Sequence, residues 1–160
     1  IRFVCPVMGP RPDEAIAAIV SACEDVASDQ SLVMGSSMGG FYATWVAEQF
    51  NCKAVLINPA VRPWRGREYL LGEQTNFHTG ERYLMEQQDI DNFARYGVES
   101  VSNPANFWVL LQTADEVLDY RHAKEFYSGC RLTIEEGGDH SFQQFERFLP
   151  AIVRFWMNQE

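Results

Sequence analysis

Clusters of basic residues and long hydrophobic runs are missing from this chain. Its 13 Lys and Arg residues stand against 22 Asp and Glu, which gives a formal net charge of −9. An acidic chain is a poor match for nucleic acid or an anionic membrane surface, so we predict neither as a partner. No apolar run approaches the roughly 20 residues of a membrane-spanning helix, and no secretory signal is visible.

Cysteine and histidine are too scarce and too widely spaced to indicate a metal site. The three histidines and four cysteines include no Cys-x-x-Cys pair and no cluster of ligands; the cysteines are Cys5, Cys23, Cys52 and Cys130. We therefore predict no metal and no cofactor. We interpret the cysteines as small buried thiols kept reduced in the cytoplasm.

The apolar residues that are present alternate between strand and helix patterns. They make up 46% of the 160 residues, enough for the core of one domain, which we predict to span residues 1–160. Continuous apolar strands alternating with helices indicate the α/β fold class, with a mostly parallel sheet and helices on both faces. The patterns predict strands at 1–5, 32–34, 53–59, 106–112 and 131–136, and helices at 13–27, 41–50, 120–128 and from Pro150 onward.

One segment interrupts this alternation. Residues 62–105 carry several aromatic side chains among many polar ones, and the pattern predicts a helix at 81–93. An insertion over the carboxyl ends of the strands would act as a lid or as a wall of the substrate site. The alternative is that this insertion packs on the domain without contacting a ligand.

A serine lies between a predicted strand and a predicted helix, in the sequence Gly35-Ser36-Ser37-Met38-Gly39. A Gly-x-Ser-x-Gly turn in this context exposes the serine hydroxyl in a strained conformation, and we expect side chains at Gly35 or Gly39 to crowd the neighbouring elements. The N-terminus of the following helix favours negative charge near Ser37, so the Met38 N–H is a natural oxyanion donor. A Gly/Ser-rich loop that matches the pattern by chance is the alternative.

A serine nucleophile needs a base, and only three histidines are available. His140 follows the strand at 131–136 directly, and loops that leave the carboxyl ends of parallel strands are where ligands and catalytic groups lie. His78 falls in the polar insertion. We interpret His122, which has charged neighbours inside a predicted helix, as a solvated helix residue. His140 is therefore the predicted base.

The acid that orients this base is expected at the end of the preceding strand. Asp115 follows the strand at 106–112 and is the predicted acid, with Glu116 and Asp119 as competitors. Asp119 lies at the start of the next predicted helix, where a role as N-cap accounts for an aspartate. Asp139 is adjacent to His140 in sequence, which is a poor geometry for orienting its ring. The order Ser37, Asp115, His140 matches the serine, acid, histidine order of α/β-hydrolases.

Four longer segments carry a more specific resemblance. Taken in order, they are similar to the YqiA-like esterases, a family of small bacterial α/β-hydrolases: Gly35–Thr44, Asn58–Pro63, Gln112–Arg121 and Gly137–Phe142. The resemblance implies hydrolysis of carboxylic esters with a preference for short acyl chains. It also places the nucleophile, acid and base on Ser37, Asp115 and His140.

The chain departs from this family at its beginning. Such proteins are expected to start with a strand and a glycine-containing loop that supplies a second oxyanion N–H, and nothing before Ile1 provides them. In the α/β-hydrolase sheet that strand lies between the strands at 1–5 and 32–34. We therefore expect a few tens of residues upstream in the native protein.

The sequence thus predicts a cytoplasmic serine esterase that acts on a small-molecule ester through an acyl-enzyme. A thioesterase or another acyl transferase with the same triad is an alternative, because the leaving group is selected by the shape of the pocket. A catalytically weak binding protein on a hydrolase fold is another. The triad residue types at the strand ends count against this last alternative, whereas the missing N-terminal loop counts for it.

Overall fold

The computed structural model describes residues 1–23, 30–65, 71–75 and 80–158. The chain divides into two compact units. Unit 1 combines Ile1–Val26 with Arg62–Gly97, and unit 2 combines Ala27–Val61 with Val98–Glu160. Within the described ranges, no helix is both long enough and apolar enough to cross a lipid bilayer.

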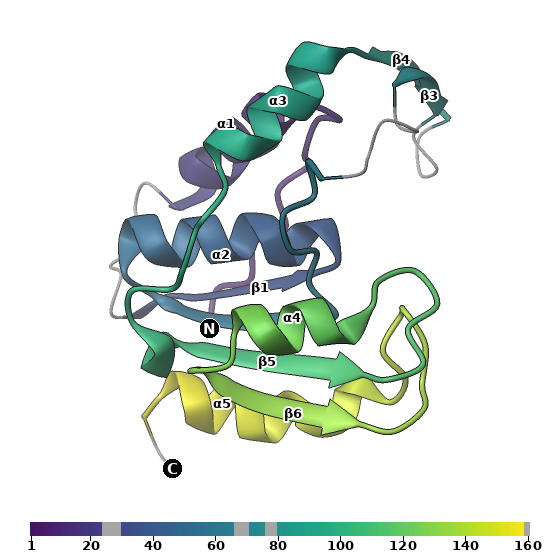
Figure 1. The fold of residues 1–160 in the computed structure, drawn as a ribbon. Coiled ribbons are helices and arrows are strands. Elements are labelled where there is room, and N and C mark those ends of the chain that lie inside the picture. The colour runs from purple at the N-terminus through teal and green to yellow at the C-terminus, as the bar shows by residue number, and fades with distance from the viewer. Residues whose placement is uncertain (24–29, 66–70, 76–79, 159–160) are drawn as a thin grey trace. The chain divides into compact units, whose positions relative to one another are not determined.

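Unit 2 is built on a parallel sheet of four strands in the order β1-β2-β5-β6 (Figure 1). The strands are β1 (Leu32–Ser36), β2 (Lys53–Ile57), β5 (Phe107–Gln112) and β6 (Arg131–Glu135). All three neighbouring pairs are parallel, so the carboxyl ends of the strands meet at one edge of the sheet. This edge is where the predicted site residues are expected.

Strand β5, one of the two inner strands, shows why the sheet is covered on both faces. All six of its residues, Phe-Trp-Val-Leu-Leu-Gln, are buried, and successive side chains of a strand point to opposite faces. Phe107, Val109 and Leu111 belong to one apolar cluster, whereas Trp108 and Leu110 belong to a second. A continuous apolar strand of this kind is typical of a parallel sheet between two layers of helices.

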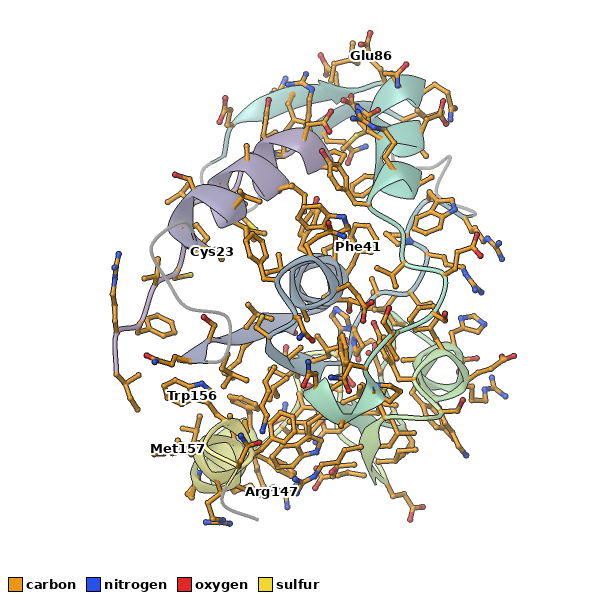
Figure 2. The ribbon with its side chains drawn as sticks, turned by 90° about the vertical axis from the view of Figure 1, so that its left-hand side faces the viewer. Cys23, Phe41, Glu86, Arg147, Trp156 and Met157 are labelled. Carbon is orange, nitrogen blue, oxygen red and sulfur yellow. The ribbon has the colours of Figure 1, made fainter. Side chains whose placement is uncertain are left out.

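Three helices of unit 2 form these two layers. Helices α2 (Met38–Phe50) and α4 (Tyr120–Phe126) contribute to the cluster of Phe107, and α5 (Leu149–Trp156) contributes to the cluster of Trp108. Figure 2 views the three helices nearly along their axes, with Phe41 labelled on α2 and Trp156 on α5. It shows α2 and α5 on opposite sides of the sheet. The predicted mostly parallel sheet with helices on both faces is therefore confirmed.

Short 3₁₀ turns complete unit 2. Pro104–Asn106 leads directly into β5, and Phe145–Phe148 leads into α5. Helix α5 starts at Leu149, with Pro150 in its first turn, which agrees with the helix predicted from Pro150 onward.

Unit 1 contains two helices and a two-stranded antiparallel sheet. They are α1 (Pro12–Cys23), β3 (Gly72–Thr75), β4 (Arg82–Met85) and α3 (Gln87–Arg95). The Asp13 carboxylate accepts hydrogen bonds from Asn92 and Tyr96 and so joins the start of α1 to α3. Asp13 lies in the first turn of α1, as predicted, and the predicted end of this helix at residue 27 lies outside the described residues.

Two predicted elements of unit 1 differ from the structure. Residues 1–9 form neither helix nor strand, so the strand predicted at 1–5 is wrong, and Cys5 is exposed rather than buried. An apolar run becomes a strand only when a neighbour pairs with its backbone groups, and none of the described residues pairs there. The helix predicted at 81–93 begins only at Gln87, because Arg82–Met85 pairs with β3.

Candidate active site

Ser37 occupies a tight turn between β1 and α2. Its backbone lies at φ 53° and ψ −121°, a region that residues other than glycine rarely adopt. Backbone hydrogen bonds hold it on both sides: the Ser37 N–H donates to the Ile57 carbonyl at 3.0 Å, and the Ser37 carbonyl accepts from Ala60 N–H at 2.9 Å. The strained turn predicted for this serine is therefore present, and it is fixed by main-chain contacts to the end of β2.

Two glycines make this turn sterically feasible. A Cβ on Gly35 would lie 2.0 Å from the Gly39 carbonyl oxygen, and a Cβ on Gly40 would lie 2.6 Å from Cβ of Pro59. The prediction that Gly39 is also short of space is wrong, because no described atom lies within 4 Å of a Cβ built there. The turn packs against Gly35 and Gly40, whereas the Gly39 position faces open space.

The His140 side chain lies between the serine and an aspartate. His140 Nε2 is 3.0 Å from Ser37 Oγ, and His140 Nδ1 is 2.9 Å from each carboxylate oxygen of Asp115. All three residues belong to unit 2. The structure thus brings together the three residues that the sequence predicts as nucleophile, base and acid.

Asp115 is held more firmly than a single contact to histidine would hold it. Its side chain is only 2% exposed, against 22% for His140. Asp115 Oδ1 also accepts the backbone N–H groups of Val117 at 2.9 Å and Leu118 at 2.8 Å. These two bonds fix the plane of the carboxylate, and the carboxylate in turn orients the imidazole.

The competing acids have other roles in the structure. Asp119 caps α4 by accepting the Arg121 N–H at 3.0 Å, and Arg121 lowers the pKa of this carboxyl from 3.8 to about 2. Glu116 accepts the backbone N–H of His140 at 3.0 Å, so it binds the main chain of this residue and not its ring. Asp139 accepts a hydrogen bond from the Gln143 amide. The cap predicted at Asp119 is therefore confirmed.

Of the other two histidines, only His122 lies among the described residues. His122 is exposed on α4, as predicted for a solvated helix residue. His78 lies outside the described residues.

Met38, the predicted oxyanion donor, is the first residue of α2. Among the backbone hydrogen bonds of the described residues, none has the Met38 N–H as donor. The first N–H groups of a helix lack partners within the helix and attract negative charge. The position of Met38 at the start of α2 fits the role of oxyanion donor, which stays a prediction.

Two buried amides at the same edge of the sheet were not predicted from the sequence. Asn58 and Gln112 are 2% and 3% exposed, and both hydrogen bond to the loop that carries His140. A signal was present, because each is a single amide residue at the end of an otherwise apolar strand. Such a position also fits a solvated strand end, so the sequence alone did not separate the two interpretations.

The geometry can be compared with known proteins. Residues 1–157 match the model of the uncharacterised protein family UPF0227, which is the YqiA family. The chain belongs to this family. The resemblance to this family is thereby confirmed.

Solved structures show the same fold at low sequence identity. A protein from Agrobacterium vitis S4 has 19% identity and a TM-score of 0.69, with 89% of this chain and 67% of that chain covered. Mouse alpha/beta hydrolase domain-containing protein 10 has 16% identity and a TM-score of 0.67, with 92% and 69% covered. The monoacylglycerol lipase of Paleococcus ferrophilus has 17% identity and a TM-score of 0.67, with 96% and 77% covered. These likenesses show that the UPF0227 chain has the α/β-hydrolase fold.

Proposed function

We propose that this chain is a serine esterase that hydrolyses short-chain carboxylic esters through an acyl-enzyme. The observation that carries the proposal is the continuous hydrogen-bonded path from Ser37 Oγ through the His140 ring to the Asp115 carboxylate. A serine hydroxyl is a weak nucleophile unless a base lies within hydrogen-bond reach and a third group orients that base. The preference for short acyl chains rests on the family resemblance.

The first half of the reaction forms the acyl-enzyme. Ser37 Oγ attacks the ester carbonyl carbon while His140 Nε2 takes the hydroxyl proton. The Met38 N–H stabilises the negative charge that develops on the carbonyl oxygen. The tetrahedral intermediate then collapses: the bond to the alcohol oxygen breaks, and His140 returns the proton to the leaving alcohol. Asp115 stays ionised and stabilises the imidazolium that forms between these steps.

The second half releases the acid. His140 takes a proton from a water molecule, whose oxygen attacks the acyl carbon. The bond to Ser37 Oγ then breaks, and the proton returns to the serine, so that a carboxylic acid leaves and the enzyme is restored. Because the leaving group departs in the first half, ester and thioester substrates share the second half.

The first prediction is that Ser37→Ala abolishes turnover. We expect kcat on p-nitrophenyl acetate and butyrate to fall by about 10⁴-fold or more, because the nucleophile is lost. The protein should be expressed with any residues that its gene encodes before Ile1. Matched ester and thioester substrates measured side by side decide which leaving group is preferred.

Two controls make this test decisive. Circular dichroism of Ser37→Ala checks that the fold survives, since the residue has a positive φ. A fluorophosphonate probe should label the wild-type protein on Ser37 and leave the variant unlabelled. Ester turnover at the wild-type rate in a folded, unlabelled Ser37→Ala protein would disprove the proposed function.

A further inference from the structure

The loop that carries His140 is held by two buried amide side chains from other strands. Residues 137–143 follow β6, whereas Asn58 follows β2 and Gln112 ends β5. The hydrogen bonds of the two amide side chains go to groups other than the Ser37 hydroxyl and the His140 ring. Both instead hydrogen bond to the main chain of the loop, on either side of His140.

Asn58 uses its whole side chain in this arrangement. Its Nδ2 donates to two successive carbonyl oxygens, those of Asp139 at 3.0 Å and His140 at 3.1 Å. Its Oδ1 accepts the backbone N–H of Gln112 at 3.0 Å. The backbone of Asn58 lies at φ 40°, which asparagine tolerates better than most residues do. Asn58 therefore fixes the carbonyl groups that flank His140 relative to the ends of β2 and β5.

Gln112 completes the attachment from the next strand. Its Oε1 accepts the backbone N–H groups of Asp139 at 3.2 Å and Gln143 at 2.8 Å, and its Nε2 donates to the Gln143 carbonyl at 3.1 Å. The remaining Nε2 proton is donated to Glu135 at 3.1 Å. A Cβ at residue 138, where glycine has φ 75°, would lie 2.0 Å from Gln112 Oε1. The loop thus approaches this amide as closely as a residue without a side chain allows.

The two amides satisfy loop groups that would otherwise be costly. A buried backbone N–H or carbonyl left without a partner costs free energy. When one amide is removed, we therefore expect the loop to shift until its backbone groups find other partners or water. Reacting groups must lie within a few tenths of an ångström of their working positions, and a displacement of about 1 Å can cost about 100-fold in rate. The 3.0 Å contact between His140 Nε2 and Ser37 Oγ depends on where this loop lies.

We propose that Asn58 and Gln112 are positioning residues that set the distance between His140 and Ser37 by holding the main chain of the loop. This inference rests on the proposed function for its kinetic consequence. The attachment itself has a structural consequence that does not depend on activity. The two consequences can be measured separately.

The decisive variant is Asn58→Asp, which keeps the shape and the tolerance of positive φ. It replaces an amide that donates to two carbonyl oxygens with a carboxylate that faces the same two oxygens. We expect kcat on p-nitrophenyl butyrate to fall by about 100-fold with little change in KM, because the base is displaced while the substrate site is unaltered. Labelling of Ser37 by the fluorophosphonate should slow in parallel.

Hydrogen exchange provides the readout that is independent of catalysis. The N–H groups of Asp139 and Gln143 donate to Gln112, so their exchange should accelerate in Asn58→Asp while exchange in the sheet is unchanged. Asn58→Gly is the second variant, since glycine also tolerates positive φ and introduces no charge. Asn58→Gly should also lower kcat and accelerate exchange in the loop, so it tests the proposal even if Asn58→Asp does not fold.

The matched control is Asn106→Asp, which makes the same chemical change at the opposite end of β5. Asn106 donates to Asn51 at 3.1 Å in an exposed pair, so we expect wild-type kcat, KM and loop exchange. If the folded Asn58 variants keep wild-type kcat or wild-type exchange at Asp139 and Gln143, the positioning role is wrong. If the wild-type protein shows no turnover that depends on Ser37, the proposed function fails, and loop exchange alone decides whether the two amides hold the loop.

Discussion

The serine turn and the histidine loop are held in place by different kinds of contact. Both place a reactive side chain at the carboxyl edge of the sheet. Ser37 is fixed by main-chain hydrogen bonds to Ile57 and Ala60 and by a lack of space around nearby glycines. The loop of His140 is fixed by side chains that arrive from two other strands, those of Asn58 and Gln112. Both parts depend on the assembled sheet, but the serine turn is held through main-chain groups and the histidine loop through side chains.

The difference shows how each half of the site responds to substitution. A side chain added at Gly35 meets backbone atoms that cannot move without opening the junction of β1 and α2, so we expect a loss of stability. A change in the contacts of the histidine loop leaves the sheet in place and displaces a base, so it is felt as a loss of rate. Stability and activity are thus expected to separate between the two regions.

Among substitutions that disturb His140, the largest fall in kcat is expected from Asp115→Asn. The bonds from Val117 and Leu118 keep an oxygen at the Oδ1 position, so the new amide nitrogen faces His140 Nδ1. This donor favours the tautomer that carries its proton on Nε2, and that nitrogen can no longer accept the proton of Ser37. We expect kcat to fall by about 10⁴-fold with an unchanged urea midpoint. Steady-state kinetics and urea unfolding measure both, and a fall of less than about tenfold would contradict the assignment of the acid.

The matching test of the serine half compares two alanine substitutions. Gly35→Ala should lower the free energy of unfolding by about 3 kcal/mol, because its Cβ would meet the backbone of Gly39 and Gly40 at less than 3 Å. Gly39→Ala should change it by no more than about 0.5 kcal/mol, because its Cβ meets nothing. Urea unfolding followed by circular dichroism measures both. Equal stability losses at the two positions would show that the turn is not constrained as described.

The smallest effect is expected at Asp119, which serves neither half of the site. Its carboxylate caps α4, and Arg121 lowers its pKa from 3.8 to about 2. A lowered pKa means that the folded state prefers the ionised form, so the stabilisation is complete above about pH 4 and is lost as the pH falls toward about 2. Asp119→Ala should therefore lower the urea midpoint slightly at neutral pH, and its difference from wild type should shrink on acidification. A difference that is constant with pH would exclude this origin.

The same contrast explains what the sequence could predict. Apolar strands in a parallel sheet end at a common edge, so Ser37, Asp115 and His140 could be assigned to one site before any contact was known. The serine turn was the easiest part to predict, because its Gly-x-Ser-x-Gly pattern lies in adjacent residues. Asn58 and Gln112 were missed, because their partners lie on a loop far along the chain.

The errors in unit 1 have a related cause. The segment Gly72–Thr75 is Gly-Glu-Gln-Thr, which has no apolar alternation, and it becomes strand β3 by pairing with Arg82–Met85. The predicted strand at residues 1–5 has the apolar pattern and lacks a partner among the described residues. Pairing thus decided both cases, and periodicity along one segment carries no information about pairing. Whether residues 62–105 cover the site stays a prediction.

The position of Asn58 in the sequence also bears on its susceptibility to deamidation. Asparagine side chains deamidate when the backbone nitrogen of the following residue attacks the side-chain carbonyl carbon, and the aspartate that results would be the same residue that Asn58→Asp introduces. The following residue here is Pro59, whose ring nitrogen carries no hydrogen and cannot complete the usual cyclic intermediate. The amide that holds the histidine loop is therefore followed by the residue that best protects it from spontaneous chemical damage, and a preparation stored for long periods should lose other asparagine amides first.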